Sequence, residues 1–123
     1  MTTRLRWLDV PGDALAPRPF LARRPAGDVP GVLWSPVARA GGPSPGEPPP
    51  VVLLGHGGSG HKTTDRLCRL AGLLRRAGVA ALAIDGPFHG DRAGPGDAGP
   101  GYQRRVIALG ADPVMDSMVA DWL

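Results

Sequence analysis

Hydrophobic and polar positions change their spacing along the chain, and each spacing predicts a different element. Residues 4–8 alternate basic and apolar side chains, which predicts a half-exposed first strand. A second short strand is expected at 31–34, and the proline-bearing stretch 16–30 before it is expected to form an irregular connection or a ragged hairpin. Val51–Leu54 and residues 79–84 are continuous apolar runs, which are typical of buried parallel strands.

Between these two runs, residues 64–77 show the clearest helical spacing in the chain. One apolar stripe recurs at helical intervals and consists of Leu67, Leu70, Ala71 and Leu74. Thr64 is the expected N-cap, and Gly78 is expected to end the helix in a left-handed conformation. Gly72 interrupts the helix and is expected to bring it close to the sheet.

Two shorter helices are expected near the end of the sequence. The first covers residues 102–109, and the second opens at Asp112 with Pro113 at its first position. One side of the second helix is apolar, with Met115, Met118, Val119 and Trp122. A helix of this kind needs a sheet to cover.

A strand, a helix and a second strand joined by short loops form a right-handed βαβ unit. We therefore predict an α/β fold with an open, mainly parallel sheet. Gly and Pro number 19 and 15 among 123 residues, but they concentrate in 11–36, 41–50 and 86–101. The proline-rich turn 41–50 is expected to be a spacer inside one domain that spans residues 1–123, because neither flank is long enough to fold alone.

Charge and cysteine content narrow the class of protein. The net charge is +3, but the arginines are scattered among eleven acids, so nucleic-acid binding is not expected. Cys68 is the only cysteine, which fits a reducing compartment, and its place in a predicted helix suggests a small buried side chain. The sequence has no signal-peptide pattern and no apolar run long enough for a bilayer. We expect a cytoplasmic protein.

The glycine-rich loop after Val51–Leu54 is the first candidate site, because ligands bind at the carboxyl ends of strands in open α/β sheets. A phosphate loop is one interpretation, but His61 is inserted between Gly60 and Lys62, so the Walker spacing is missed by one residue. Ser59 as a nucleophile is a second interpretation, yet G-x-S-x-G would need glycine at position 61. Ser59 is better explained as a loop or capping hydroxyl.

The third interpretation is an oxyanion loop. A strand followed by His56-Gly57-Gly58 has the residues that such a loop needs, because glycine lets the backbone turn sharply and approach a substrate without a Cβ. A backbone N–H of Gly57 or Gly58 would then face the developing oxyanion. His56 would hold the loop by hydrogen bonding and would not be the catalytic base.

Two motifs together resemble the α/β-hydrolase superfamily, of the dienelactone-hydrolase or acyl-esterase type. The first is Gly-His-Gly-Gly-Ser-Gly-His-Lys at 55–62, and the second is Asp-Gly-Pro-Phe-His-Gly-Asp-Arg at 85–92. The second motif resembles the D-x-x-G-H-G turn that follows the fourth strand in many such enzymes. The resemblance covers nearly the whole chain and corresponds to the N-terminal part of that fold, ending before the nucleophile strand.

The resemblance implies hydrolysis of a carboxylic ester or related acyl bond through a serine acyl-enzyme, with a small-molecule substrate and no cofactor. It assigns the oxyanion hole to the backbone of Gly57 and Gly58. Loop support and the pocket wall fall to His56, Ser59, Asp85 and His89. No member of the catalytic triad is expected in this chain, which contains no G-x-S-x-G. We therefore expect the chain to be inactive alone.

The same residues allow three other interpretations. A metal site at His56, His61, Asp85, His89 and Asp91 is not expected, because their spacing matches no metal-ligand motif. A P-loop-like protein that binds phosphate or a nucleotide through residues 55–63 is the first alternative function. A non-enzymatic fragment that needs a partner chain, or self-associates through an exposed sheet edge, is the second.

Overall fold

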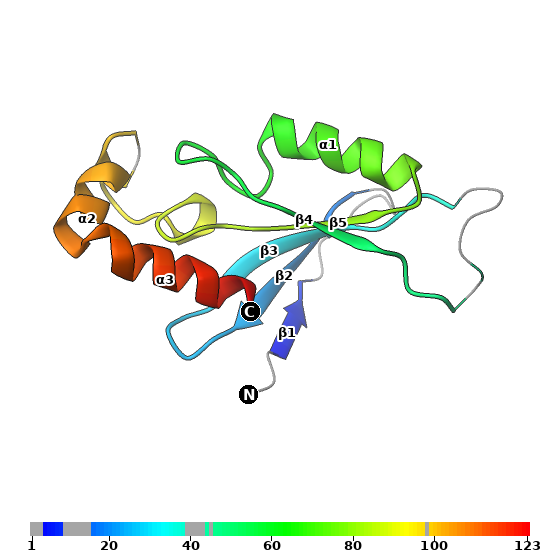
Figure 1. Cartoon of the computed structure of the whole chain (residues 1–123), viewed down its shortest axis with the longest axis horizontal. Helices are drawn as coiled ribbons and strands as arrows, with labels where there is room; N and C mark the ends of the chain where they lie inside the picture. The colour runs from blue at the N-terminus through cyan, green and yellow to red at the C-terminus, as the bar shows by residue number, and fades with distance from the viewer. Residues whose placement is uncertain (1–3, 9–15, 39–43, 45, 98) are drawn as a thin grey trace.

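A computed structural model describes residues 4–8, 16–38, 44, 46–97 and 99–123 of the chain. In order, the elements are β1 (Arg4–Trp7), β2 (Arg18–Arg23), β3 (Val29–Trp34), β4 (Val51–Leu54), α1 (Asp65–Arg76), β5 (Ala80–Ile84), the 3₁₀ turn η1 (Gly90–Arg92), α2 (Gly101–Leu109) and α3 (Ala111–Trp122). Figure 1 shows the strands as a twisted sheet with α1 on one side and α3 on the other.

The α/β class is confirmed, but the strand pairing is mixed and not mainly parallel. The strand order is β1-β2-β3-β5-β4, and only β4 and β5 pair in parallel. The physical reason lies in the connections. The β2–β3 turn is too short for a crossover, so these strands form an antiparallel hairpin, whereas α1 between β4 and β5 allows a parallel return.

The predicted βαβ unit is present, but its first strand is not buried as expected. β4 lies at the edge of the described sheet, and Val51 and Leu53 are 50% and 56% exposed. Only Leu54 of this strand is buried. An apolar run cannot distinguish a central strand from an edge strand, because strand order depends on distant pairing.

Alternate side chains of the sheet enter two cores on opposite faces. On the α1 face, Leu67 and Ala71 of the helix pack against a buried set made of Val32, Trp34, Leu54, Ala81 and Ala83. On the other face, Phe20, Ala22, Val29 and Ile84 form a second buried set, and Trp122 of α3 packs against it. The two cores hold α1 and α3 against the strands from which the loops described below emerge.

α1 begins and ends close to the predicted residues. Thr64 occupies the N-cap position, although its side chain makes no capping hydrogen bond, and Gly78 follows the helix with φ +81°. The Gly78 N–H donates to the Arg75 carbonyl and the Val79 N–H to the Leu74 carbonyl. These bonds satisfy carbonyls of the last turn. A Cβ built on Gly72 would meet open space, so this glycine is not required by contact with the sheet.

Two other expectations differ from the structure. Cys68 is exposed on α1 and not buried, because it lies off the stripe that faces the sheet. α3 begins at Ala111, so Pro113 is its third residue and not its first. This is tolerated because the first four N–H groups of a helix have no partner within it. Residues 41–43 and 45 of the predicted proline-rich turn lie outside the described residues.

No helix among the described residues is both long and apolar enough to cross a membrane.

Candidate active site

Two loops meet at the carboxyl ends of the parallel strands β4 and β5. The glycine-rich loop, residues 55–64, follows β4, and the turn 85–92 follows β5. Because β4 and β5 are parallel neighbours, their carboxyl ends lie side by side and bring the two motifs together. The two sequence motifs therefore lie together at the carboxyl ends of these strands.

Asp85 joins the two loops through a buried carboxylate. This side chain is completely buried and accepts hydrogen bonds from three donors: the Lys62 backbone N–H at 2.9 Å, the Lys62 ammonium at 2.6 Å and the Asp91 backbone N–H at 2.9 Å. The same ammonium also contacts Asp91, at 2.7 Å. A Cβ at Gly90 would collide with the Asp85 carboxylate, so the turn requires glycine there.

The charges of this cluster stabilise one another. Burial by itself would raise the pKa of Asp85, but the hydrogen bonds from Lys62 and from the Asp91 backbone outweigh burial and hold it below the ordinary 3.8. Burial would likewise lower the pKa of Lys62, yet its bonds to Asp85 and Asp91 raise it above the ordinary 10.5. Both groups are therefore ionised at neutral pH.

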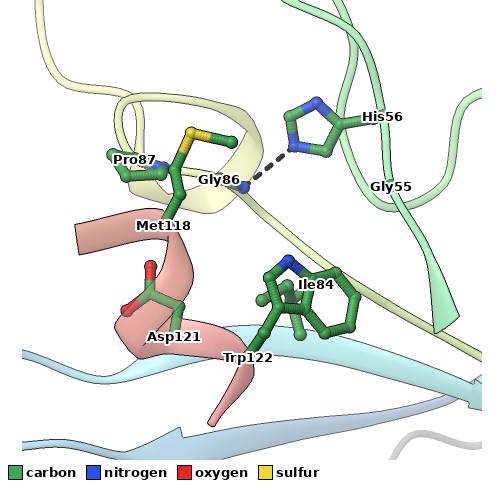
Figure 2. Close-up of a pocket in the computed structure, with 8 residues that line it drawn as sticks. All are labelled: Gly55, His56, Ile84, Gly86, Pro87, Met118, Asp121 and Trp122. Atoms are coloured by element: carbon green, nitrogen blue, oxygen red, sulfur yellow. Dashed lines mark hydrogen bonds between the residues drawn. The ribbon is translucent and has the colours of Figure 1, made fainter. Parts of the chain in front are cut away.

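His56 links the loop that contains it to the turn after β5. Its Nε2 accepts the Gly86 backbone N–H at 2.9 Å (Figure 2). Its Nδ1 lies 2.8 Å from the Gly57 carbonyl oxygen. A ring nitrogen that accepts carries no proton, and a carbonyl can only accept. These contacts therefore assign the neutral ring with its proton on Nδ1, donated to Gly57.

Gly57 and Gly58 form a double glycine, and the carbonyls of both are in hydrogen-bond contact with a partner. The Gly57 carbonyl accepts from Nδ1 of His56 and from the Gly60 N–H. The Gly58 carbonyl oxygen lies 2.7 Å from Nε2 of His89. In a trans peptide the N–H points opposite to the C=O, so a bound Gly57 carbonyl fixes the direction of the Gly58 N–H. No hydrogen bond among the described residues uses the N–H of Gly57 or Gly58.

A cavity of about 230 Å³ opens beside the double glycine. One wall is polar, with His56, Gly57, Gly58 and His89. The opposite wall is mostly apolar and comes from α2 and α3, with Val106, Val114, Met115 and Met118. We call this space the apolar cavity. Gly57 and Gly58, whose N–H groups are unpaired in the described part of the chain, thus line the same concave space as an apolar surface.

A second, smaller cavity of about 40 Å³ lies between His56 and the end of α3. Figure 2 shows Met118 and Trp122 of α3 on one side and the His56–Gly86 hydrogen bond on the other. Asp121 also lines this space and accepts from the Arg92 guanidinium at 2.6 Å. Since Arg92 also donates to the Asp85 carbonyl, this ion pair attaches α3 to the turn after β5.

The remaining predicted residues occupy less central places. Ser59 is an exposed turn residue that lines a third cavity on the far side of Gly58. Nδ1 of His61 lies 3.2 Å from the Thr63 backbone nitrogen and 3.2 Å from the Thr63 hydroxyl oxygen. No group of three metal-ligating side chains occurs among the described residues. Although Cys68 is exposed, desolvation and then the charge of Asp65 raise the pKa of its thiol, which makes it less reactive.

Sequence reasoning missed three residues of this site. The sequence suggests only a phosphate-binding role for Lys62, yet its ammonium is held between two carboxylates. In the sequence, Arg92 is only the last residue of a motif, and Tyr102 only the first residue of a predicted helix. A lysine inside a glycine-rich loop, followed by an aspartate at the next strand end, is the one signal that could have indicated the Lys62–Asp85 pair.

The fold of this chain is similar to that of a known esterase. No protein-family model matches the chain, and no curated protein does. Among solved structures, it is similar to the PEG-bound complex of a novel cold-adapted esterase from an Arctic intertidal metagenomic library, with 36% identity and a TM-score of 0.51. The match covers 73% of this chain and 35% of that one, so the chain spans about a third of that esterase's length.

The likeness confirms the predicted resemblance in its coarser form, an esterase-like hydrolase. The dienelactone-hydrolase type stays a prediction.

Proposed function

We propose that this chain supplies the oxyanion-binding part of an ester-hydrolysing α/β hydrolase. The observation that carries the proposal is the pair of glycine N–H groups beside the apolar cavity. They belong to a loop in which His56 contacts the Gly57 carbonyl and His89 contacts the Gly58 carbonyl. Donors held in place before reaction stabilise a developing oxyanion without reorganisation. The likeness to a cold-adapted esterase supports the same chemistry.

In this proposal, Gly57 and Gly58 donate to the carbonyl oxygen of a small ester, and the apolar cavity receives its acyl chain. At about 230 Å³ the cavity is below the usual range of about 300–1,000 Å³ for ligand pockets, which favours a short aliphatic acyl group. His56 and His89 hold the loop, and Asp85 anchors the turn that forms the cavity wall. No cofactor is required.

The chemical step requires a nucleophile that the printed sequence does not place in G-x-S-x-G. Without one, oxyanion and binding effects alone give only residual catalysis. We therefore expect the 123-residue chain to hydrolyse p-nitrophenyl butyrate no faster than its Ser59→Ala variant. Turnover that depends on Ser59 would contradict this part of the proposal.

The contacts of Lys62 favour this function over phosphate binding. A phosphate-loop lysine must reach the β- and γ-phosphates, whereas the Lys62 ammonium is bound by Asp85 and Asp91 and is nearly buried. Any phosphate at this loop would also meet those two carboxylates.

Binding of a carboxylate tests the proposal directly. Butyrate carries a negatively charged oxygen and a short apolar chain, so it mimics both halves of the proposed site. Titrated into ¹⁵N-labelled protein, butyrate should shift the Gly57 and Gly58 amide signals and leave Gly27, in the β2–β3 turn, unchanged. Shifts of the same glycines with inorganic phosphate and not with butyrate would favour the phosphate-binding alternative and overturn this one.

A further inference from the structure

Tyr102 of α2 lies directly against the double glycine. A Cβ built on Gly58 would collide with the Tyr102 hydroxyl oxygen, so only glycine allows this approach. The tyrosine ring packs on His89 with 4.7 Å between ring centroids. His89 in turn contacts the Gly58 carbonyl, so ring and loop are held in one arrangement.

The hydroxyl has no partner within the described part of the chain. No hydrogen bond there involves the Tyr102 oxygen, and the side chain is only partly buried. The residue lines the apolar cavity on one side and the cavity beyond Gly58, of about 270 Å³, on the other. A phenolic O–H is therefore available beside Gly58, a residue that lines both cavities and whose N–H is also unpaired in the described part of the chain.

We propose that the Tyr102 hydroxyl is an additional donor to the substrate's carbonyl oxygen, alongside the glycine N–H groups. This inference rests on the proposed function. A phenol donates a stronger hydrogen bond to a charged oxygen than to a neutral one, so the contact gains strength as the oxyanion develops. Tyr102 would then be a catalytic residue from α2, outside both loop motifs.

Tyr102→Phe removes the hydroxyl and keeps the ring that packs on His89. Butyrate binding, followed by the Gly58 amide shift, should weaken by about 10- to 150-fold, the range expected for loss of one hydrogen bond to a charged group. The control is Ser117→Ala, which removes a hydroxyl from α3 at a residue that lines neither cavity. It should leave the dissociation constant for butyrate unchanged.

Butan-1-ol separates a donor from a residue that only shapes the cavity, because it has the apolar chain without the carboxylate. Its binding, followed by the Met118 methyl signal, should be the same in wild type and Tyr102→Phe. An equal loss for both probes, or a butyrate constant within twofold of wild type, would overturn the assignment of Tyr102 alone. Absence of any butyrate shift at Gly57 and Gly58 in the wild type would instead overturn the proposed function.

Discussion

At the residue scale, Asp85 is the group on which the two loops depend. It is fully buried, and its partner Lys62 holds a second carboxylate, Asp91, whose side chain is 73% exposed. The two aspartates therefore contact one ammonium from very different environments. A buried ion pair is costly to break because one charge is left without its partner, whereas an exposed pair contributes little.

Asp85→Asn should therefore lower the free energy of unfolding by about 3–5 kcal/mol. The matched control is Asp91→Asn, which should cost no more than about 1 kcal/mol because that carboxylate is exposed. Urea unfolding followed by tryptophan fluorescence measures both. Equal losses for the two variants would show that burial does not distinguish these contacts.

The same pair predicts how stability changes with pH. The pKa of Asp85 is lower in the folded protein than its ordinary 3.8, so its contribution is present above that value. It is lost as pH falls through the folded pKa. Lys62 behaves in the opposite sense: its pKa is raised above 10.5, so its contribution is lost only as pH rises through that higher value. Unfolding measured from pH 7 to pH 2 should show a smaller acid loss in Asp85→Asn than in wild type.

At the element scale, α1 and β3 contain glycines with opposite requirements. A Cβ on Gly72, in the middle of α1, would meet nothing within 4 Å. A Cβ on Gly31, in β3, would collide with the ring of Phe20, its partner in the β2–β3 register. Phe20 is buried in the core, so its ring cannot move aside freely.

Gly72→Ala should thus stabilise the protein by about 0.5–1 kcal/mol, the difference in helix propensity. Gly31→Ala should destabilise it by about 1–3 kcal/mol, the usual cost of overpacking a core. Thermal unfolding by circular dichroism measures both shifts. A lower melting temperature for Gly72→Ala would mean that this glycine has a role beyond the contacts seen here.

At the scale of the whole molecule, β4 leaves one edge of the sheet open. No described strand pairs with its outer side, and Val51 and Leu53 expose apolar side chains there. Unpaired backbone groups next to apolar side chains favour pairing with another strand. We expect a second copy of this chain to associate through β4 as concentration rises.

Val51→Lys with Leu53→Lys should reduce that association, because charged side chains discourage edge-to-edge pairing. Sedimentation velocity at several concentrations gives the measurement. Val37→Lys, which adds charge at another exposed apolar residue outside the strands, is the control and should change little. A wild-type monomer at every concentration would contradict the expectation.

Local pattern alone predicted the elements at the site and the order in which they follow one another. The apolar runs before and after α1, its stripe at Leu67 and Ala71, and the stop at Gly78 are all short-range signals, and each is present. The glycine-rich loop was also placed correctly, since a loop after a strand must emerge at that strand's carboxyl end.

Only the tertiary structure decided which distant groups meet. The Lys62–Asp85 pair, the contact of His89 with Gly58 and the approach of Tyr102 to the same glycine join residues on separate elements. Such contacts depend on strand order and on how α2 packs, and neither leaves a periodic trace in the sequence. For the same reason the pattern could not show that β4 lies at the sheet's edge, or that most strands pair antiparallel.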